Sequence, residues 1–346
     1  MEKLCKFGTH RVIYPLGTLP QSAQKVDNQM VCYDNEILCD VETLNIDSAS
    51  FTQIRKACQD DMHLMSEMII DIVEKKGKMQ NPVTGSGGMF LGRINQIGKN
   101  IKTENKVGDP IASLVSLSLT PLKIDEILGI DIEKDQVHVK GQAILFETGI
   151  FAKIPNDLPP HIVLSALDVC GAPAQVNHLV KEKDSVLILG AAGKSGVLCS
   201  YQAKKNAGNQ GNVIGVVYSE AEKEDLDALN VCNHIIVGDA TQPMSIYQKV
   251  MDINHGQVDV TINVVNVENT EMTSILPTKS DGVVYFFSMA TSFTKAALGA
   301  EGIASEAKMI IGNGYTKDHA DFTLNILRES REMYQLFERR YGKEVR

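Results

Sequence analysis

The sequence predicts an α/β protein, with mainly β-structure in its first half and a doubly wound parallel sheet in its second half. Three observations support this fold class. From Met1 to about Pro155, short runs with strand-like alternation are separated by turns. From about Asn156, segments typical of buried strands alternate with helical segments, which is the pattern of a parallel sheet covered by helices on both faces. A glycine-rich turn, Gly190–Gly196, connects the first of these strands to its helix.

The size and composition restrict the possible functions. The 346 residues are enough for two domains. A formal net charge of −9 argues against nucleic acid or an anionic membrane surface as the main partner. No apolar run approaches the roughly 18 residues of a membrane span, and the N-terminus lacks a signal-peptide core. Seven scattered cysteines fit reduced thiols, so we expect a cytoplasmic protein. Its expected partner is a small-molecule substrate.

The first domain is predicted over residues 1–155. Glu36–Asn45 alternates in the manner of a strand. From 54 to 76 the apolar residues recur at helical spacing, which predicts one helical insert in this domain. The glycine-rich segment Asn81–Gly98 follows, where the chain must turn tightly or approach another group closely.

The second domain is predicted over residues 156–318 and contains six strands, the number in a complete doubly wound sheet. These strands are expected at Val186–Leu189, Asn212–Ser219, His234–Val237, Val258–Val264, Val283–Phe287 and Met309–Ile311. A charged amphipathic helix, about His319–Tyr341, occupies most of the remaining residues 319–346. The sequence leaves open which domain this helix belongs to.

The turn between the first strand and its helix predicts a dinucleotide site. Gly190 permits the tight turn, Gly193 allows a pyrophosphate to approach the backbone, and Gly196 lets the helix pack closely on the strand. The pyrophosphate then lies on the free N–H groups of the helix N-terminus. The end of the turn also matches a triphosphate-binding P-loop, but residue 188 is Ile where that loop needs glycine.

The end of the second strand predicts which nicotinamide cofactor is bound. An NAD site places Asp or Glu there to bind the ribose hydroxyls, whereas this strand ends in Val217-Tyr218-Ser219. Tyr218 and Ser219 can bond a 2′-phosphate, with Lys194 or Lys223 as a counter-charge, so the sequence favours NADP over NAD. The residues expected to bind the cofactor are Gly190, Ala192, Gly193, Lys194, Ser195, Gly196, Tyr218, Ser219 and, after the fifth strand, Ser288.

Several stretches resemble a known family. Gly92 and Gly98 before Val107-Gly108-Asp109, and then the glycine turn, resemble the medium-chain dehydrogenase/reductase superfamily, in which a GroES-like catalytic domain precedes a Rossmann domain. A closer resemblance, to the L-erythro-3,5-diaminohexanoate dehydrogenases of lysine fermentation, is carried by FGTHRVI (7–13), NPVTGSGGM (81–89), SLSLTPL (116–122), GAAGKSG (190–196), FFSMATSFTKAALGAEG (286–302) and IGNGYTK (311–317). That resemblance implies NAD(P)-dependent oxidative deamination at C3 of a diamino acid, and a homo-oligomer.

The resemblance also bears on the question of a metal. Alcohol dehydrogenases of the superfamily hold catalytic zinc with two cysteines and a histidine, and these positions fall at Asp47, Gly88 and near Cys170. One thiol and one carboxylate fall short of three protein ligands, so the sequence predicts no zinc. Cys58 and His63 are no substitute, because on one helix they would point about 140° apart.

The implied chemistry needs a base, because hydride leaves an amine-bearing carbon only when the amine is neutral. Asp47 is the leading candidate, with capping of the following turn as its structural alternative. Further hydrogen bonds are expected from Ser48, Ser50, Thr84 and Ser86, of which Ser86 is included among the catalytic candidates, although serines in such loops also form turns. Glu147 offers a second carboxylate on an apolar strand, or else a paired structural acid. The cations open for the substrate carboxylate are Arg11, Arg93 and Lys295.

Two other functions remain open at this point. A zinc-free quinone or enone reductase shares the domain order, and its pocket would be apolar and would not need Asp47. A non-catalytic redox sensor would bind a dinucleotide through the same glycine turn without turning over any substrate.

Overall fold

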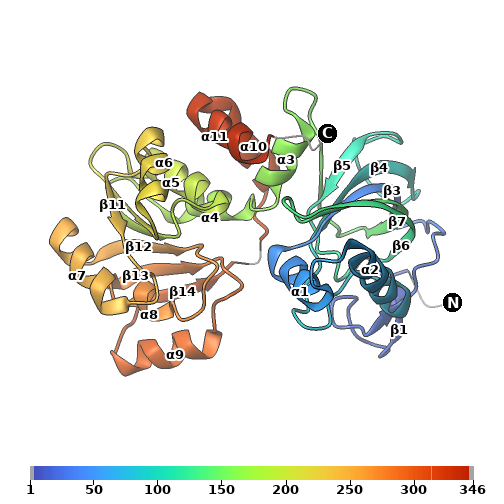
Figure 1. Ribbon diagram of the computed structural model, residues 1–346, viewed down its shortest axis with the longest axis horizontal. Coiled ribbons are helices and arrows are strands. Elements are labelled where there is room, and N and C mark those ends of the chain that lie inside the picture. Colours follow the sequence, from blue (N-terminus) through green and yellow to red (C-terminus); the bar gives the residue numbers. More distant parts are fainter. Residues whose placement is uncertain (1–3, 313, 343–346) are drawn as a thin grey trace. The chain divides into compact units, whose positions relative to one another are not determined.

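The computed structural model describes residues 4–312 and 314–342, and the chain divides into two compact units (Figure 1). The boundary between the units falls between Leu164 and Ser165. The first unit is mainly β-structure and the second is built on a parallel sheet, so the predicted fold class is confirmed. No described helix is both long and apolar enough to cross a membrane.

The first unit is built on a six-stranded antiparallel sheet in the order β6-β7-β3-β4-β5-β8. Its strands are β3 Glu36–Asn45, β4 Met89–Ile97, β5 Pro110–Ser113, β6 Leu122–Asp131, β7 Gln136–Phe146 and β8 Phe151–Lys153. A separate ribbon, preceded by the short 3-10 helix Thr9–Arg11, pairs β1 Val12–Tyr14 with β2 Lys25–Val26. Alternate side chains of β3 point into the core of this unit, as the sequence pattern predicts.

Two helices cover this sheet where the sequence predicts one. They are α1 Ser48–Cys58 and α2 Met62–Lys76, and their apolar faces pack into the same core as β3. Gln59 and Asp60 both have left-handed backbone angles, which end α1. Asp61 then caps α2 by accepting hydrogen bonds from two backbone N–H groups. The single helical insert over 54–76 was therefore wrong, because no glycine or proline marks the break.

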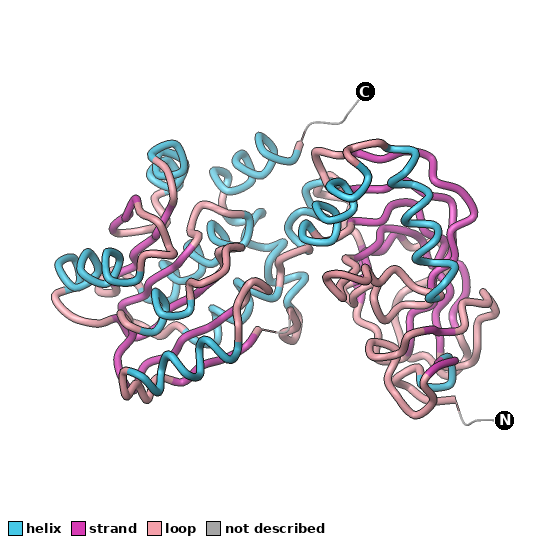
Figure 2. Tube along the Cα trace, turned by 60° about the horizontal axis from the view of Figure 1, so that its bottom comes forward, coloured by secondary structure: helices cyan, strands magenta, loops and turns pink. Residues whose placement is uncertain are grey.

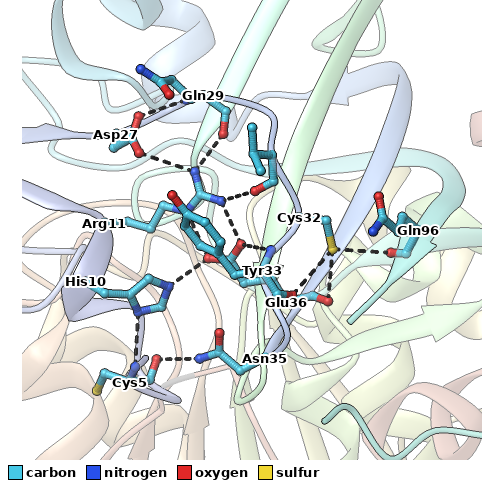
Figure 3. A network of polar contacts seen from close by, with 11 residues as sticks. Cys5, His10, Arg11, Asp27, Gln29, Cys32, Tyr33, Asn35, Glu36 and Gln96 are labelled. Carbon is cyan, nitrogen blue, oxygen red and sulfur yellow. Dashed lines mark hydrogen bonds and ion pairs between the residues drawn. The ribbon is translucent and has the colours of Figure 1, made fainter. Parts of the chain in front are cut away.

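A buried ion pair ties the N-terminal segment to the start of β3 (Figure 3). The Arg11 guanidinium donates to both carboxylate oxygens of Glu36, at 2.8 and 2.6 Å, and both side chains are fully buried. His10 Nε2 lies 2.8 Å from the same carboxylate. Burial alone would raise the pKa of Glu36, but the hydrogen bonds from Arg11 and His10 lower it below its ordinary value.

The second unit contains a six-stranded sheet in the order β11-β10-β9-β12-β13-β14, with every strand parallel to its neighbours. Its strands are β9 Ser185–Leu189, β10 Asn212–Val217, β11 His234–Val237, β12 Val258–Asn263, β13 Thr278–Phe286 and β14 Lys308–Ile311. All six predicted strands are present. The strand order reverses between β9 and β12, which is where a doubly wound sheet binds its ligand.

Helices lie on both sides of these parallel strands (Figure 2). They are α4 Gly171–Leu179, α5 Lys194–Ala207, α6 Glu220–Leu229, α7 Pro243–Asn254, α8 Glu271–Ile275 and α9 Phe293–Gly302, with α3 Pro160–Leu167 at the boundary between the units. The final segment forms two helices, α10 His319–Glu329 and α11 Arg331–Tyr341, instead of the single helix predicted. Ser330 has an extended backbone that ends α10, and its side chain caps α11. Both helices pack within the second unit.

Candidate active site

The glycine turn after β9 has the geometry that a dinucleotide requires. Gly190 has a φ of +79°, and a Cβ at this position would lie 2.8 Å from the Val265 backbone. A Cβ at Gly196 would lie 2.1 Å from the Gly190 carbonyl oxygen. The predicted roles of Gly190 in the turn and of Gly196 in the close packing of α5 therefore have a steric cause, whereas a Cβ at Gly193 would meet only the Gly190 carbonyl oxygen, at 3.4 Å.

The N-terminus of α5 presents its backbone N–H groups beside this turn. Gly193 is the N-cap residue and supplies no side-chain cap, which leaves the first N–H groups of α5 without an acceptor in the helix. Ser195 is buried in the first turn. Lys194 Nζ lies 2.8 Å from Asp168, so its charge is partly balanced by the protein. These features fit the pyrophosphate of a dinucleotide.

A carboxylate lies just after the end of β10, although the strand position at which an NAD site would have its acid has none. Ser219 caps α6 by accepting from the Glu222 N–H, and the Glu222 side chain folds back so that Oε2 accepts from the Tyr218 N–H at 2.7 Å. The Ser219-x-x-Glu222 spacing is that of a capping box and can be read from the sequence, but here the Glu222 carboxylate bonds the N–H of Tyr218 instead of that of the N-cap residue Ser219. The Tyr218 side chain is 75% exposed. An acidic group thus lies beside the Tyr218 N–H, just after the end of β10.

The end of β13 borders a small cavity. Its volume is about 140 Å³, and Ser288 and Thr291 line it together with mostly apolar side chains. The Thr291 hydroxyl is buried, and no described residue hydrogen-bonds to it. The cavity therefore lies at the carboxyl edge of the sheet, where a doubly wound fold binds its ligand.

In the first unit, Asp47 joins a cluster of three hydroxyl groups. Asp47 lies between β3 and α1, where Oδ1 accepts from the Ser50 N–H at 3.0 Å and Oδ2 accepts from Ser86 Oγ at 2.8 Å. Ser50 Oγ lies 2.5 Å from Thr84 Oγ1 and 2.9 Å from Ser86 Oγ. Asp47 therefore caps α1, as its structural alternative predicts, and its second oxygen is held by Ser86.

Glu147 lies far from this cluster. It is exposed in the turn after β7 rather than on an apolar strand. Because Phe146 pairs with Glu36 and Asn45 pairs with Gln136, the two ends of β3 separate Glu147 from Asp47 by about 30 Å. The expectation that Glu147 adds a second carboxylate beside Asp47 is therefore corrected.

The three cations considered for the substrate carboxylate all have protein partners. Arg11 is fully buried against Glu36, at the end of β3 away from Asp47. Arg93 forms an exposed pair with Glu42, and Lys295 donates to the Asn269 side chain at 2.6 Å. Arg11 is therefore excluded as a substrate ligand.

The positions that align with the superfamily's zinc ligands are Asp47, Gly88 and Cys170, and Gly88 has no side chain to bind a metal. Gly88 has a φ of +101°, and a Cβ there would lie 2.0 Å from the Asn45 carbonyl oxygen, so no ligating side chain fits. Cys170 is buried at the start of α4. Within residues 4–312 and 314–342, no three His, Cys, Asp or Glu side chains gather as a metal would need. Cys58 and His63 lie on separate helices.

Comparison with known proteins identifies the family. The family described as L-erythro-3,5-diaminohexanoate dehydrogenase N-terminal domain matches residues 10–155. The chain is 56% identical to the L-erythro-3,5-diaminohexanoate dehydrogenase of Acetoanaerobium sticklandii, over 98% of this chain and 99% of that protein. It is also 56% identical to the enzyme of the same name from Fusobacterium nucleatum subsp. nucleatum, over 99% of this chain and 100% of that protein.

A solved structure supports the fold at much lower identity. A mycobacterial protein complexed with NADPH aligns with a TM-score of 0.55 and 15% identity, over 93% of this chain and 94% of that one. The resemblance seen in the sequence is thus confirmed over nearly the whole length of the curated relatives. The chain belongs to the L-erythro-3,5-diaminohexanoate dehydrogenase family.

Proposed function

We propose that the protein oxidises the C3 amine of L-erythro-3,5-diaminohexanoate with a nicotinamide dinucleotide, as a step of lysine fermentation. The observation that carries this proposal is the 56% identity to two dehydrogenases of that name over 98% of the chain or more. One substrate, one water and one oxidised cofactor give 5-amino-3-oxohexanoate, ammonium, the reduced cofactor and one proton. When bound, the nicotinamide accepts the hydride from C3.

Asp47 is proposed to hold the reacting nitrogen and to take its proton. Each carboxylate oxygen can accept more than one hydrogen bond, so Oδ2 can accept from an ammonium while it accepts from Ser86. Ser86 Oγ lies 3.1 Å from Thr84 Oγ1, and Thr84 is exposed, which gives the proton a route to water. The same carboxylate then assists water to attack the iminium. No step needs a metal.

A rate assay distinguishes this function from the quinone or enone reductase. Purified protein in buffer with EDTA is mixed with the diamino acid and NAD or NADP, and reduced cofactor is followed by its absorbance from pH 7 to 10. We expect reduction that EDTA does not slow. Oxidation of NADH or NADPH by simple quinones, with no reaction of the diamino acid at any of these pH values, would instead establish the reductase. Binding of a dinucleotide without any turnover would indicate the redox sensor.

The structure changes the preference between NAD and NADP. The sequence favours NADP because the end of β10 has no acid, whereas Glu222 of α6 brings a carboxylate to the Tyr218 N–H beside that end. Its negative charge would repel a 2′-phosphate and can accept hydrogen bonds from the ribose hydroxyls. We therefore propose NAD as the cofactor.

This proposal predicts the specificity of the enzyme. We expect kcat/KM for NAD to exceed that for NADP at least about tenfold, and Glu222→Gln to reduce the ratio by weakening NAD and relieving repulsion of NADP. Glu224→Gln, an exposed neighbour on α6, is the matched control and should leave the ratio unchanged. A wild-type preference for NADP would contradict the proposal.

Two further properties are proposed, the assembly of the protein and its compartment. We infer a homo-oligomer, because β14 is an edge strand that exposes Met309 and Ile311. Sedimentation of a monomer at micromolar concentration would contradict it.

We place the protein in the cytoplasm because all seven cysteines are free thiols, and cell fractionation tests this.

A further inference from the structure

Two residues at the end of α11 contact the glycine turn from a distant part of the sequence. Arg340 Nη1 donates to the Ala192 carbonyl oxygen at 2.7 Å, across a separation of 148 residues. The adjacent Tyr341 presents its ring to Lys194, whose Nζ lies 5.4 Å from the ring centroid. These two contacts are made with the residues immediately before and after Gly193, the N-cap residue of α5.

A carboxylate on α6 holds Arg340 in place. Asp225 Oδ2 accepts from Arg340 Nη2 at 2.7 Å, and Asp225 Oδ1 accepts from the neighbouring Arg339. Burial alone would raise the pKa of Asp225, but the two arginines lower it, so the carboxylate stays ionised. The Arg340 side chain is 22% exposed and that of Arg339 is 63% exposed. Only Arg340 of this pair contacts the turn in the described structure.

The packing of α11 makes it a fixed support. Met333, Leu336 and Phe337 are buried on one face, and α11 packs against α10 and α6, as its position in Figure 1 also indicates. The turn Gly190–Gly196 contains three glycines and no side-chain cap, and glycine loses more backbone freedom on ordering than other residues do. A turn held in its binding conformation before the cofactor arrives saves that cost on binding.

We propose that Arg340 is a positioning residue of the dinucleotide site. By holding the Ala192 carbonyl, it keeps the free N–H groups in the first turn of α5 directed at the pyrophosphate. This inference rests on the proposed function, because it takes the ligand of the turn to be a nicotinamide dinucleotide. The Arg340 guanidinium also places positive charge beside a site for two phosphates. The C-terminal helix thereby becomes part of the cofactor site without contacting the reacting atoms.

Binding of NADH and of NADPH, followed by cofactor fluorescence without substrate, tests the inference. Arg340→Met removes the bond to Ala192, and Arg339→Met is the matched control because it removes only the second bond to Asp225. We expect Arg340→Met to raise Kd for the preferred cofactor about tenfold and Arg339→Met to raise it less than about twofold. Arg340→Lys should recover part of the loss, and it keeps the test usable if the methionine variant does not fold.

The kinetics separate a positioning role from a general loss of stability. At saturating cofactor, KM for the diamino acid should be unchanged in Arg340→Met, and the rise in its Kd for the cofactor should persist at temperatures well below the Tm of both variants. Equal increases in Kd for the two variants, or no increase in either, would overturn the role of Arg340. A wild-type protein that binds neither NADH nor NADPH would instead refute the proposed function, so the two failures are distinguishable.

Discussion

Replacing Asp47 by asparagine is expected to lower kcat for the diamino acid by about 100- to 10,000-fold. Asparagine is as good an N-cap residue as aspartate, so α1 should remain capped through Ser50. The neutral amide cannot take a proton from the substrate ammonium or stabilise its charge. The loss should therefore appear in the rate of cofactor reduction, while Tm and the Kd for NADH stay close to wild type.

A second cap provides the control for this variant. Asp61 caps α2 with the same kind of side-chain bonds to backbone N–H groups, and no catalytic role is assigned to it. Asp61→Asn should keep full activity. If Asp47→Asn retains activity within about fivefold of wild type, Asp47 is a helix cap only and the proposed base is wrong. Ser86→Ala should show an intermediate loss, because it removes the bond that holds Asp47 Oδ2.

Replacing Arg11 by methionine is expected to lower the free energy of unfolding by about 3–5 kcal/mol. The substitution leaves Glu36 fully buried without its strongest partner (Figure 3). It also frees the carbonyl groups of Gln29 and Val31, which Arg11 holds at 2.6 Å each. Urea unfolding of wild type and variant at pH 7 measures the difference.

An exposed ion pair and a pH series complete this test. Arg93 and Glu42 form a pair with 54% and 58% exposed side chains, so Arg93→Met should cost no more than about 1 kcal/mol. The pKa of Glu36 is lower in the folded state than in the unfolded state. The ion pair with Arg11 therefore stabilises the fold fully above the ordinary carboxyl pKa, and this stabilisation is lost as pH falls through the lowered pKa of the folded state. The difference between wild type and Arg11→Met should shrink toward pH 3. Equal effects of the two substitutions at pH 7 would contradict a stabilising buried pair.

The parts of the fold that could be predicted depend on local pattern. The strand β9, the turn at Gly190 and the helix α5 follow from a run of apolar residues and glycines with a steric role. The breaks at Gln59–Asp60 and at Ser330 could not be predicted in the same way, because ordinary residues take up the change of direction there. Left-handed backbone at non-glycine residues leaves no reliable mark in a sequence.

The site shows the same limit at longer range. Glu147 and Arg11 were candidates by residue type, and only the register of β3 with β7 shows that they lie at the other end of the sheet from Asp47. Arg340 reaches the glycine turn through the packing of α11, which no spacing in the chain indicates. Glu222 is different, because its capping-box spacing could have been recognised from the sequence.

The central claim is oxidative deamination at C3, and one measurement tests it most directly. The protein is incubated with NAD and 3,5-diaminohexanoate carrying deuterium at C3, and ammonia, reduced cofactor and the position of the deuterium are measured together. The account predicts equal amounts of ammonia and reduced cofactor, with the deuterium on the nicotinamide ring. Reduced cofactor without ammonia, or ammonia without deuterium transfer to the cofactor, would contradict it.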